Sequence, residues 1–142
     1  MSEKIIIRQN KDYQVEFEAV DPHQPDSEDF QPVHGLHEIT PYGMMLVSLA
    51  TCTAQVVLSY ANHHSLKLEQ VEFRMEYDRV YQEDCDNCQH INQYEEIITE
   101  QITFQGDLSS QEREKLFKIA HQCPIEKIFR NGIEIKSEIK PN

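Results

Sequence analysis

The chain has 142 residues and a formal net charge of −12, from 25 acidic and 13 basic side chains. This length predicts one domain, spanning residues 1–142, and the acidic balance argues against nucleic acid or an anionic membrane as a partner, because phosphate groups would be repelled. No segment has the apolar pattern of a signal peptide or of a transmembrane helix, so a cytoplasmic location is expected.

The first third of the chain predicts a β-hairpin followed by a long loop. Apolar residues alternate within 4–20, on either side of the polar turn "QNKD", as two antiparallel strands require. Residues 21–39 contain three prolines and one glycine and show no periodicity, so they predict a loop. A loop this long in a small domain is often functional.

Thr40 and Pro41 predict the start of a helix that runs to about Ala61. Thr40 is a suitable N-cap, and Pro41 occupies the first helical position, where its missing N–H removes no hydrogen bond. The apolar side chains of this helix form two adjacent stripes, separated only by small or neutral polar residues. A helix that is apolar on most sides must be covered on most sides. We therefore expect a central helix covered by a sheet or by a second subunit.

The remaining sequence predicts two strands, two helices and a final strand. Ser109 and Glu112 form a capping box, and Pro124 begins a second, shorter helix. In chain order the expected segments are strand 71–81, a polar turn-like stretch 82–94, strand 95–108, a helix from 110, a short helix from 124 to about 131 and strand 133–139. This order predicts an α+β fold in which antiparallel strand pairs outweigh βαβ crossovers.

Cysteines are the candidate reactive groups. Cys52 lies in the middle of the central helix on an apolar stripe, where it is either a packing residue or a nucleophile. It is too far from the helix N-terminus to gain from the dipole, so a reactive Cys52 requires a separate cation to lower its pKa. Cys123 precedes Pro124 and so takes the N-cap position of the short helix. Backbone N–H groups there would stabilise a thiolate, and a purely capping role is the alternative.

The segment "CDNCQH" contains Cys85, Cys88 and His90 at the spacing of a metal-binding knuckle. A fourth ligand is not evident, so a zinc site, a reversible disulfide and no role at all are three open interpretations. The acidic residues beside the two cysteines raise thiol pKa values, which disfavours the redox interpretation. His121 is interpreted as a solvated or capping residue. No metal and no organic cofactor is assigned from the sequence.

Two segments carry a family resemblance. "TPYGMMLVSLATCTAQVVLSYANHHSLKLEQVEFRM" (40–75) contains a Thr-Pro helix start and a Cys-Thr-Ala centre, and "AHQCPIEKIFRNGIEI" (120–135) contains a Cys-Pro-Ile element. In this order they resemble the OsmC/Ohr family of osmotically inducible and organic-hydroperoxide-resistance proteins. The resemblance covers roughly residues 40–139.

The resemblance implies antiparallel sheets around a long buried central helix in an intertwined homodimer. It also implies a thiol peroxidase of the antioxidant stress response. Cys52 would attack a hydroperoxide substrate and become a sulfenic acid, which Cys123 would resolve as a disulfide, and an external dithiol would reduce that disulfide.

Two positions concern the activation of Cys52. The family commonly has a glutamate in the first turn of the central helix, which helps to hold an activating arginine, and the matching position here is Gly43. Arg8 precedes every other arginine by more than sixty residues and is therefore the candidate for the activating arginine. Glu38 is the candidate for the missing acid. The alternative function is a non-catalytic protein of the same fold that binds a small apolar ligand, with residues 85–90 as a metal or redox sensor.

Overall fold

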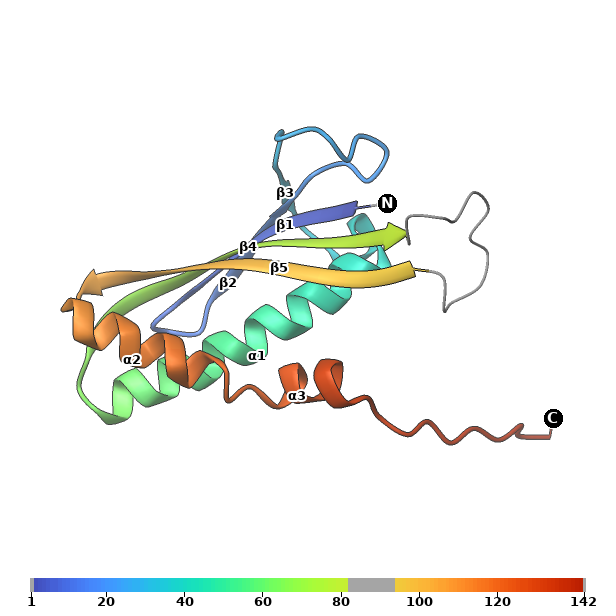
Figure 1. Ribbon diagram of the computed structural model, residues 1–142. Coiled ribbons are helices and arrows are strands. Elements are labelled where there is room, and N and C mark those ends of the chain that lie inside the picture. The colour runs from blue at the N-terminus through green and yellow to red at the C-terminus, as the bar shows by residue number, and fades with distance from the viewer. Residues whose placement is uncertain (1, 82–93, 142) are drawn as a thin grey trace.

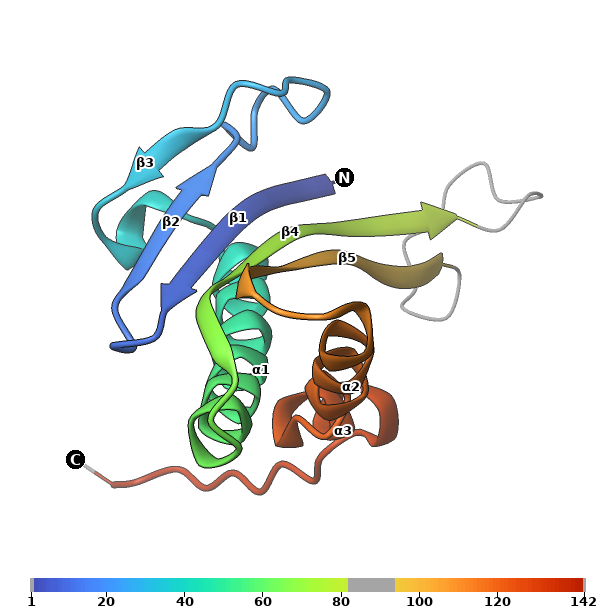
Figure 2. The ribbon, with the colours of Figure 1, turned by 90° about the vertical axis from the view of Figure 1, so that its left-hand side faces the viewer.

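Helices cover one face of an antiparallel sheet in the computed structural model, which describes residues 2–81 and 94–141 (Figures 1 and 2). The sheet has five strands in the order β3-β2-β1-β4-β5. In chain order the elements are β1 (Ser2–Asn10), β2 (Val15–Ala19), β3 (Gln31–Val33), the 3₁₀ helix η1 (Leu36–Glu38), α1 (Pro41–His63), β4 (Lys67–Tyr81), β5 (Tyr94–Asp107), α2 (Ser110–Ala120) and α3 (Pro124–Asn131). The predicted α+β class is confirmed.

The core lies between the sheet and α1. Ile5 and Ile7 point inward from β1 and are fully buried, and Phe73 and Met75 on the neighbouring strand β4 are buried with them. Leu46 supplies the facing side chain from α1. Because alternate residues of a strand face opposite sides, this pattern fixes which side of β1 carries the helix.

The start of α1 is the predicted one. The Thr40 hydroxyl accepts a hydrogen bond from the Gly43 N–H at 3.2 Å, and Pro41 stands at the first helical position. By length and composition α1 would be able to cross a membrane, but much of it packs into the core beneath the sheet (Figure 2). Its other side, which includes Ser48, Gln55 and Ser59, is exposed in the single chain.

The predicted loop 21–39 is more ordered than expected. It contains the short strand β3, which pairs with β2, and the 3₁₀ helix η1. Three paired residues are too few to produce a visible alternation in the sequence, so the sequence of this segment predicts only a loop.

The predicted closing strand over 133–139 is wrong for this chain. The segment continues from α3 without pairing to any strand in the described part of the chain and extends away from the other elements (Figure 1). Ile133, Ile135 and Ile139 are 66%, 82% and 96% exposed. The residues alternate as a strand would, but no sheet edge of the same chain lies beside them to supply hydrogen-bond partners.

The close approach of β4 to β5 at Gly106 can be tested by substitution. This glycine stands opposite Leu68, where the β4–β5 register shifts, and has a φ of +149°. A Cβ atom there would lie 2.0 Å from the carbonyl oxygen of Lys67. We expect Gly106→Ala to lower the free energy of unfolding by at least about 2 kcal/mol, because it adds a backbone clash to an unfavourable φ.

Gly132, with φ +78° and no atom within 4 Å of a built Cβ, is the matched control. Gly132→Ala introduces only the unfavourable backbone conformation, at an exposed position beside the extended C-terminal segment that can relax, and should cost about 1 kcal/mol. Urea unfolding followed by circular dichroism measures both, and equal losses would contradict the clash.

Candidate functional site

Cys52 and Cys123 come together where the middle of α1 meets the start of α3. Cys52 lies on α1 and is partly buried, and Cys123 is the N-cap residue of α3 and is 2% exposed. The two side chains are within hydrogen-bonding reach of each other, and neither forms a disulfide in this structure. Two thiols that are distant in sequence therefore form one site.

The N-terminus of α3 acts on Cys52 rather than on Cys123. The backbone N–H of Ile125, in the first turn of α3, donates a hydrogen bond to the Cys52 sulfur. Cys123 occupies the predicted N-cap position, but its side chain makes no capping hydrogen bond. The amide stabilisation that the sequence assigned to Cys123 is thus directed to the other thiol.

The surroundings of Cys52 favour the neutral thiol. Burial raises the pKa of the Cys52 thiol above its ordinary value, and the hydrogen bond with Cys123 raises this pKa further. The N–H of Ile125 lowers it, but the net direction is upward. A thiolate nucleophile at this position therefore needs additional positive charge.

Arg8 is placed on the face of the sheet opposite α1. It follows Ile7, whose side chain is buried in the core beneath the sheet, so Arg8 points the other way. Its guanidinium donates hydrogen bonds to Glu72 at 2.7 Å and to Glu18 at 2.6 Å. Within one chain the structure does not bring Arg8 to Cys52.

The position that matches the family's glutamate is close to a carboxylate from a different element. Glu3 on β1 is 3% exposed, and its Oε1 lies 3.0 Å from the place where a Cβ of Gly43 would stand. Thr40 hydrogen-bonds this carboxyl through its side chain and backbone, but burial is the larger effect and raises the pKa of Glu3. Glu38 instead accepts hydrogen bonds from the backbone N–H groups of His34 and Gly35.

Sequence reasoning missed Glu3. The signal was available, because Glu3, Ile5 and Ile7 alternate on the inward face of β1. Cys85, Cys88 and His90 lie outside the described residues.

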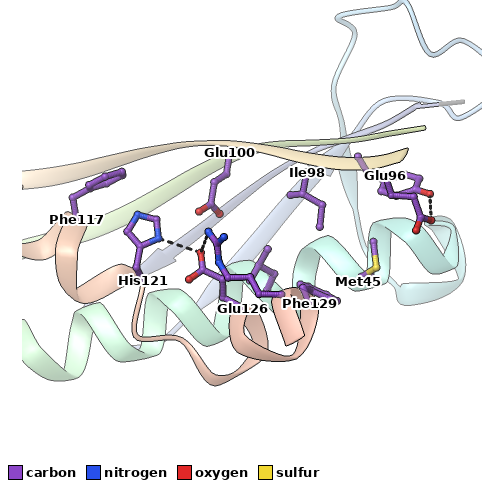
Figure 3. Close-up of a pocket in the computed structure, with 11 residues that line it drawn as sticks. Met45, Glu96, Ile98, Glu100, Phe117, His121, Glu126 and Phe129 are labelled. Atoms are coloured by element: carbon purple, nitrogen blue, oxygen red, sulfur yellow. Dashed lines mark hydrogen bonds and ion pairs between the residues drawn. The ribbon is translucent and has the colours of Figure 1, made fainter. Parts of the chain in front are cut away.

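A cavity of about 610 Å³ opens between α1, β5 and α3 (Figure 3), and its lining includes sequence neighbours of the two thiols but neither thiol itself. Its wall includes Leu49, one helical turn before Cys52, and Glu126, which follows Ile125. Most of the lining is apolar, from Met45, Leu49, Tyr77, Ile98, Phe117 and Phe129. A small molecule with an apolar body would fit this space.

Comparison with known proteins identifies the family. The family model described as OsmC-like protein matches residues 33–138, which is most of the chain. The chain belongs to the OsmC-like family. A search of curated proteins finds no match.

Solved structures agree with this OsmC-like fold. An OsmC-like hydroperoxide resistance protein from Jannaschia sp. CCS1 is 14% identical, with a TM-score of 0.60 over 99% of this chain and 94% of that chain. The organic hydroperoxide resistance protein OsmC from Legionella pneumophila is 17% identical, with a TM-score of 0.52 over 86% and 85%. OhrB of Bacillus subtilis is 15% identical, with a TM-score of 0.52 over 97% of each chain. At these identities the likeness concerns the fold.

The pKa of Cys52 is directly testable. We expect the pKa of Cys52 in the reduced protein to lie above the ordinary thiol value, and to fall in Cys123→Ala because the hydrogen bond between the thiols is lost. The pH dependence of iodoacetamide alkylation, followed at the Cys52 peptide by mass spectrometry, gives both values. Gln111→Ala, at an exposed position in the first turn of α2, is the control and should leave the profile unchanged. An unchanged profile in Cys123→Ala would show that the second thiol does not influence the first.

Proposed function

We propose that this OsmC-like protein is a thiol peroxidase that reduces organic or small hydroperoxides through Cys52 and Cys123. The observation that carries the proposal is the contact between the two thiols, both of them in the sequence contexts that resemble the family's cysteines. The proposed reaction requires reduced thiols, which fits a reducing compartment such as the cytoplasm.

The first step is attack by the Cys52 thiolate on the hydroperoxide O–O bond. A sulfur–oxygen bond forms as the O–O bond breaks, and the alkoxide that leaves takes up a proton to become an alcohol. Cys52 is thereby oxidised to a sulfenic acid. The Ile125 N–H is well placed to stabilise the attacking thiolate, because it already donates to this sulfur.

The second step forms the disulfide. Cys123, deprotonated to its thiolate, attacks the sulfenic sulfur of Cys52, the sulfur–sulfur bond forms and hydroxide leaves to be protonated to water. The short reach between the two side chains favours this step over further oxidation of Cys52 by a second hydroperoxide. An external dithiol then restores both thiols by two thiol–disulfide exchanges.

The substrate route is proposed to pass through the cavity of Figure 3. Its apolar lining favours a hydroperoxide with an alkyl or aryl body, and two of the similar solved structures are described as organic hydroperoxide resistance proteins. The same cavity is also what a purely ligand-binding protein would need, so the chemistry of the thiols must separate the two functions.

Disulfide mapping provides this separation. Reduced protein treated with one equivalent of cumene hydroperoxide should form a Cys52–Cys123 disulfide, detected by peptide mass spectrometry, with release of cumyl alcohol. Cys52→Ser should release no alcohol. Cys123→Ser should release one equivalent in a first turnover and then retain a sulfenic acid that reacts with dimedone.

Cys85→Ser/Cys88→Ser is the control for the remaining cysteines, and it should behave as the wild-type protein does. Peroxide consumption that persists in Cys52→Ser would overturn the proposed mechanism. Cavity binding of the alcohol without any thiol oxidation would favour the ligand-binding alternative.

We also propose that the protein is a homodimer in which the extended C-terminal residues pair with the second copy. Ile133, Ile135 and Ile139 alternate along a segment that is exposed and unpaired within its own chain. The side of α1 that contains Ser48 and Gln55 is likewise exposed. A second copy that covers the central helix and pairs with the segment would bury both.

Size-exclusion chromatography with light scattering tests this association. Wild-type protein should have twice the mass of the chain, and Ile135→Asp should weaken the dimer by about tenfold or more, because a charge replaces a buried apolar anchor. Lys136→Ala, at the adjacent position, is the matched control and should remain dimeric. A monomeric wild-type protein would contradict the proposal.

A further inference from the structure

We propose that Glu100, His121 and Glu126 bind a divalent transition-metal ion such as Zn²⁺. Each side chain comes from a different element, since Glu100 lies on β5, His121 caps the end of α2 and Glu126 lies in the first turn of α3. One ligand atom from each residue lies within 4.8 Å of the other two. Figure 3 shows Glu100 directed towards His121 and Glu126 at the polar end of the cavity.

The carboxylate of Glu100 lacks a partner that would explain its position. Its Oε2 is buried and has no hydrogen-bond partner among the described residues. Burial raises the pKa of Glu100, and the neighbouring carboxylate of Glu126 raises this pKa further. The positive charges of His121 and Arg130 lower it without reversing the net upward direction. An unpaired buried oxygen beside a second carboxylate is unfavourable, and a shared cation would remove both penalties.

The cations already present do not fill this role. The Arg130 guanidinium is 70% exposed and lies 3.6 Å from Glu126, and it has no hydrogen bond to Glu100 in the described contacts. His121 Nδ1 lies 3.1 Å from the Oε1 of Glu126, so the imidazole is held beside this carboxylate. The charges of both side chains also act on Glu100, but neither donates a hydrogen bond to its buried Oε2 among the described residues.

The donor set indicates the class of ion. One imidazole nitrogen and two carboxylates suit Zn²⁺, Mn²⁺ or Fe²⁺, and they lack the additional oxygen ligands that Ca²⁺ requires. Ligand atoms bound to Zn²⁺ at about 2.1 Å in a tetrahedral site lie about 3.4 Å apart, so binding would draw the three side chains together from separations of up to 4.8 Å. Three protein ligands would leave a coordination position open, and all three of these side chains line the cavity. The proposal does not depend on the peroxidase reaction.

Isothermal titration of Zn²⁺ into the Cys85→Ser/Cys88→Ser protein tests the site without competition from those two thiols. We expect one equivalent per chain, and an affinity lowered by at least about tenfold in each of Glu100→Gln, His121→Ala and Glu126→Gln. Glu95→Gln and His63→Ala replace exposed residues of the same types and should leave the affinity unchanged. Circular dichroism confirms that each variant is folded.

Co²⁺ distinguishes this site from the thiol pair. A Co²⁺ complex at the proposed ligands should show weak d–d absorption without the intense near-ultraviolet band of thiolate ligation. Saturable binding with this spectrum and with the expected loss in the three variants supports the site. Absence of saturable binding, equal affinity in the three variants and their controls, or a thiolate band would each overturn it.

Discussion

The contact between the middle of α1 and the first turn of α3 is the constraint on which the site depends. The sheet holds α1 through Ile5 and Ile7, and α2 packs on α1 through buried Leu116 and Ala120. The chain then turns at Cys123 and begins α3, which brings the Ile125 N–H to the sulfur of Cys52. Apolar packing in one layer thus determines the distance between two thiols.

The sequence was sufficient for most elements, because their signals are local. The hydroxyl caps at Thr40 and Ser109 and the proline at position 124 mark helix starts through interactions within one turn, and each is found where predicted. The prediction of a closing strand failed because alternation only assigns residues to the two faces of a strand. It does not supply a neighbouring strand to pair with. A strand depends on a partner that can be distant or absent, whereas a helix satisfies its own backbone.

Site prediction had a similar limit. Local context left a packing role open for Cys52 and a capping role open for Cys123, and the family resemblance selected the pair. Neither could show which thiol receives the amide of α3, since that depends on how the helices pack. The inward position of Glu3 follows from alternation along β1, whereas its approach to Gly43 requires the contact between β1 and the start of α1. At Gly43 the absence of a side chain leaves space for this carboxyl group, and a Cβ there would also lie 3.2 Å from that of Ile39.

Charge around the thiols limits how they can react. The chain is strongly acidic, and Glu100 and Glu126 line the cavity of Figure 3. A thiolate at Cys52 is disfavoured by burial and by the neighbouring thiol of Cys123, while a single backbone N–H offsets part of this cost. Positive charge at the carboxylates would relieve the repulsion between Glu100 and Glu126, whereas Cys52 requires positive charge close to its own sulfur. The activation of Cys52 and the neutralisation of the two carboxylates are therefore separate electrostatic requirements, in agreement with a cavity that the carboxylates line and Cys52 does not.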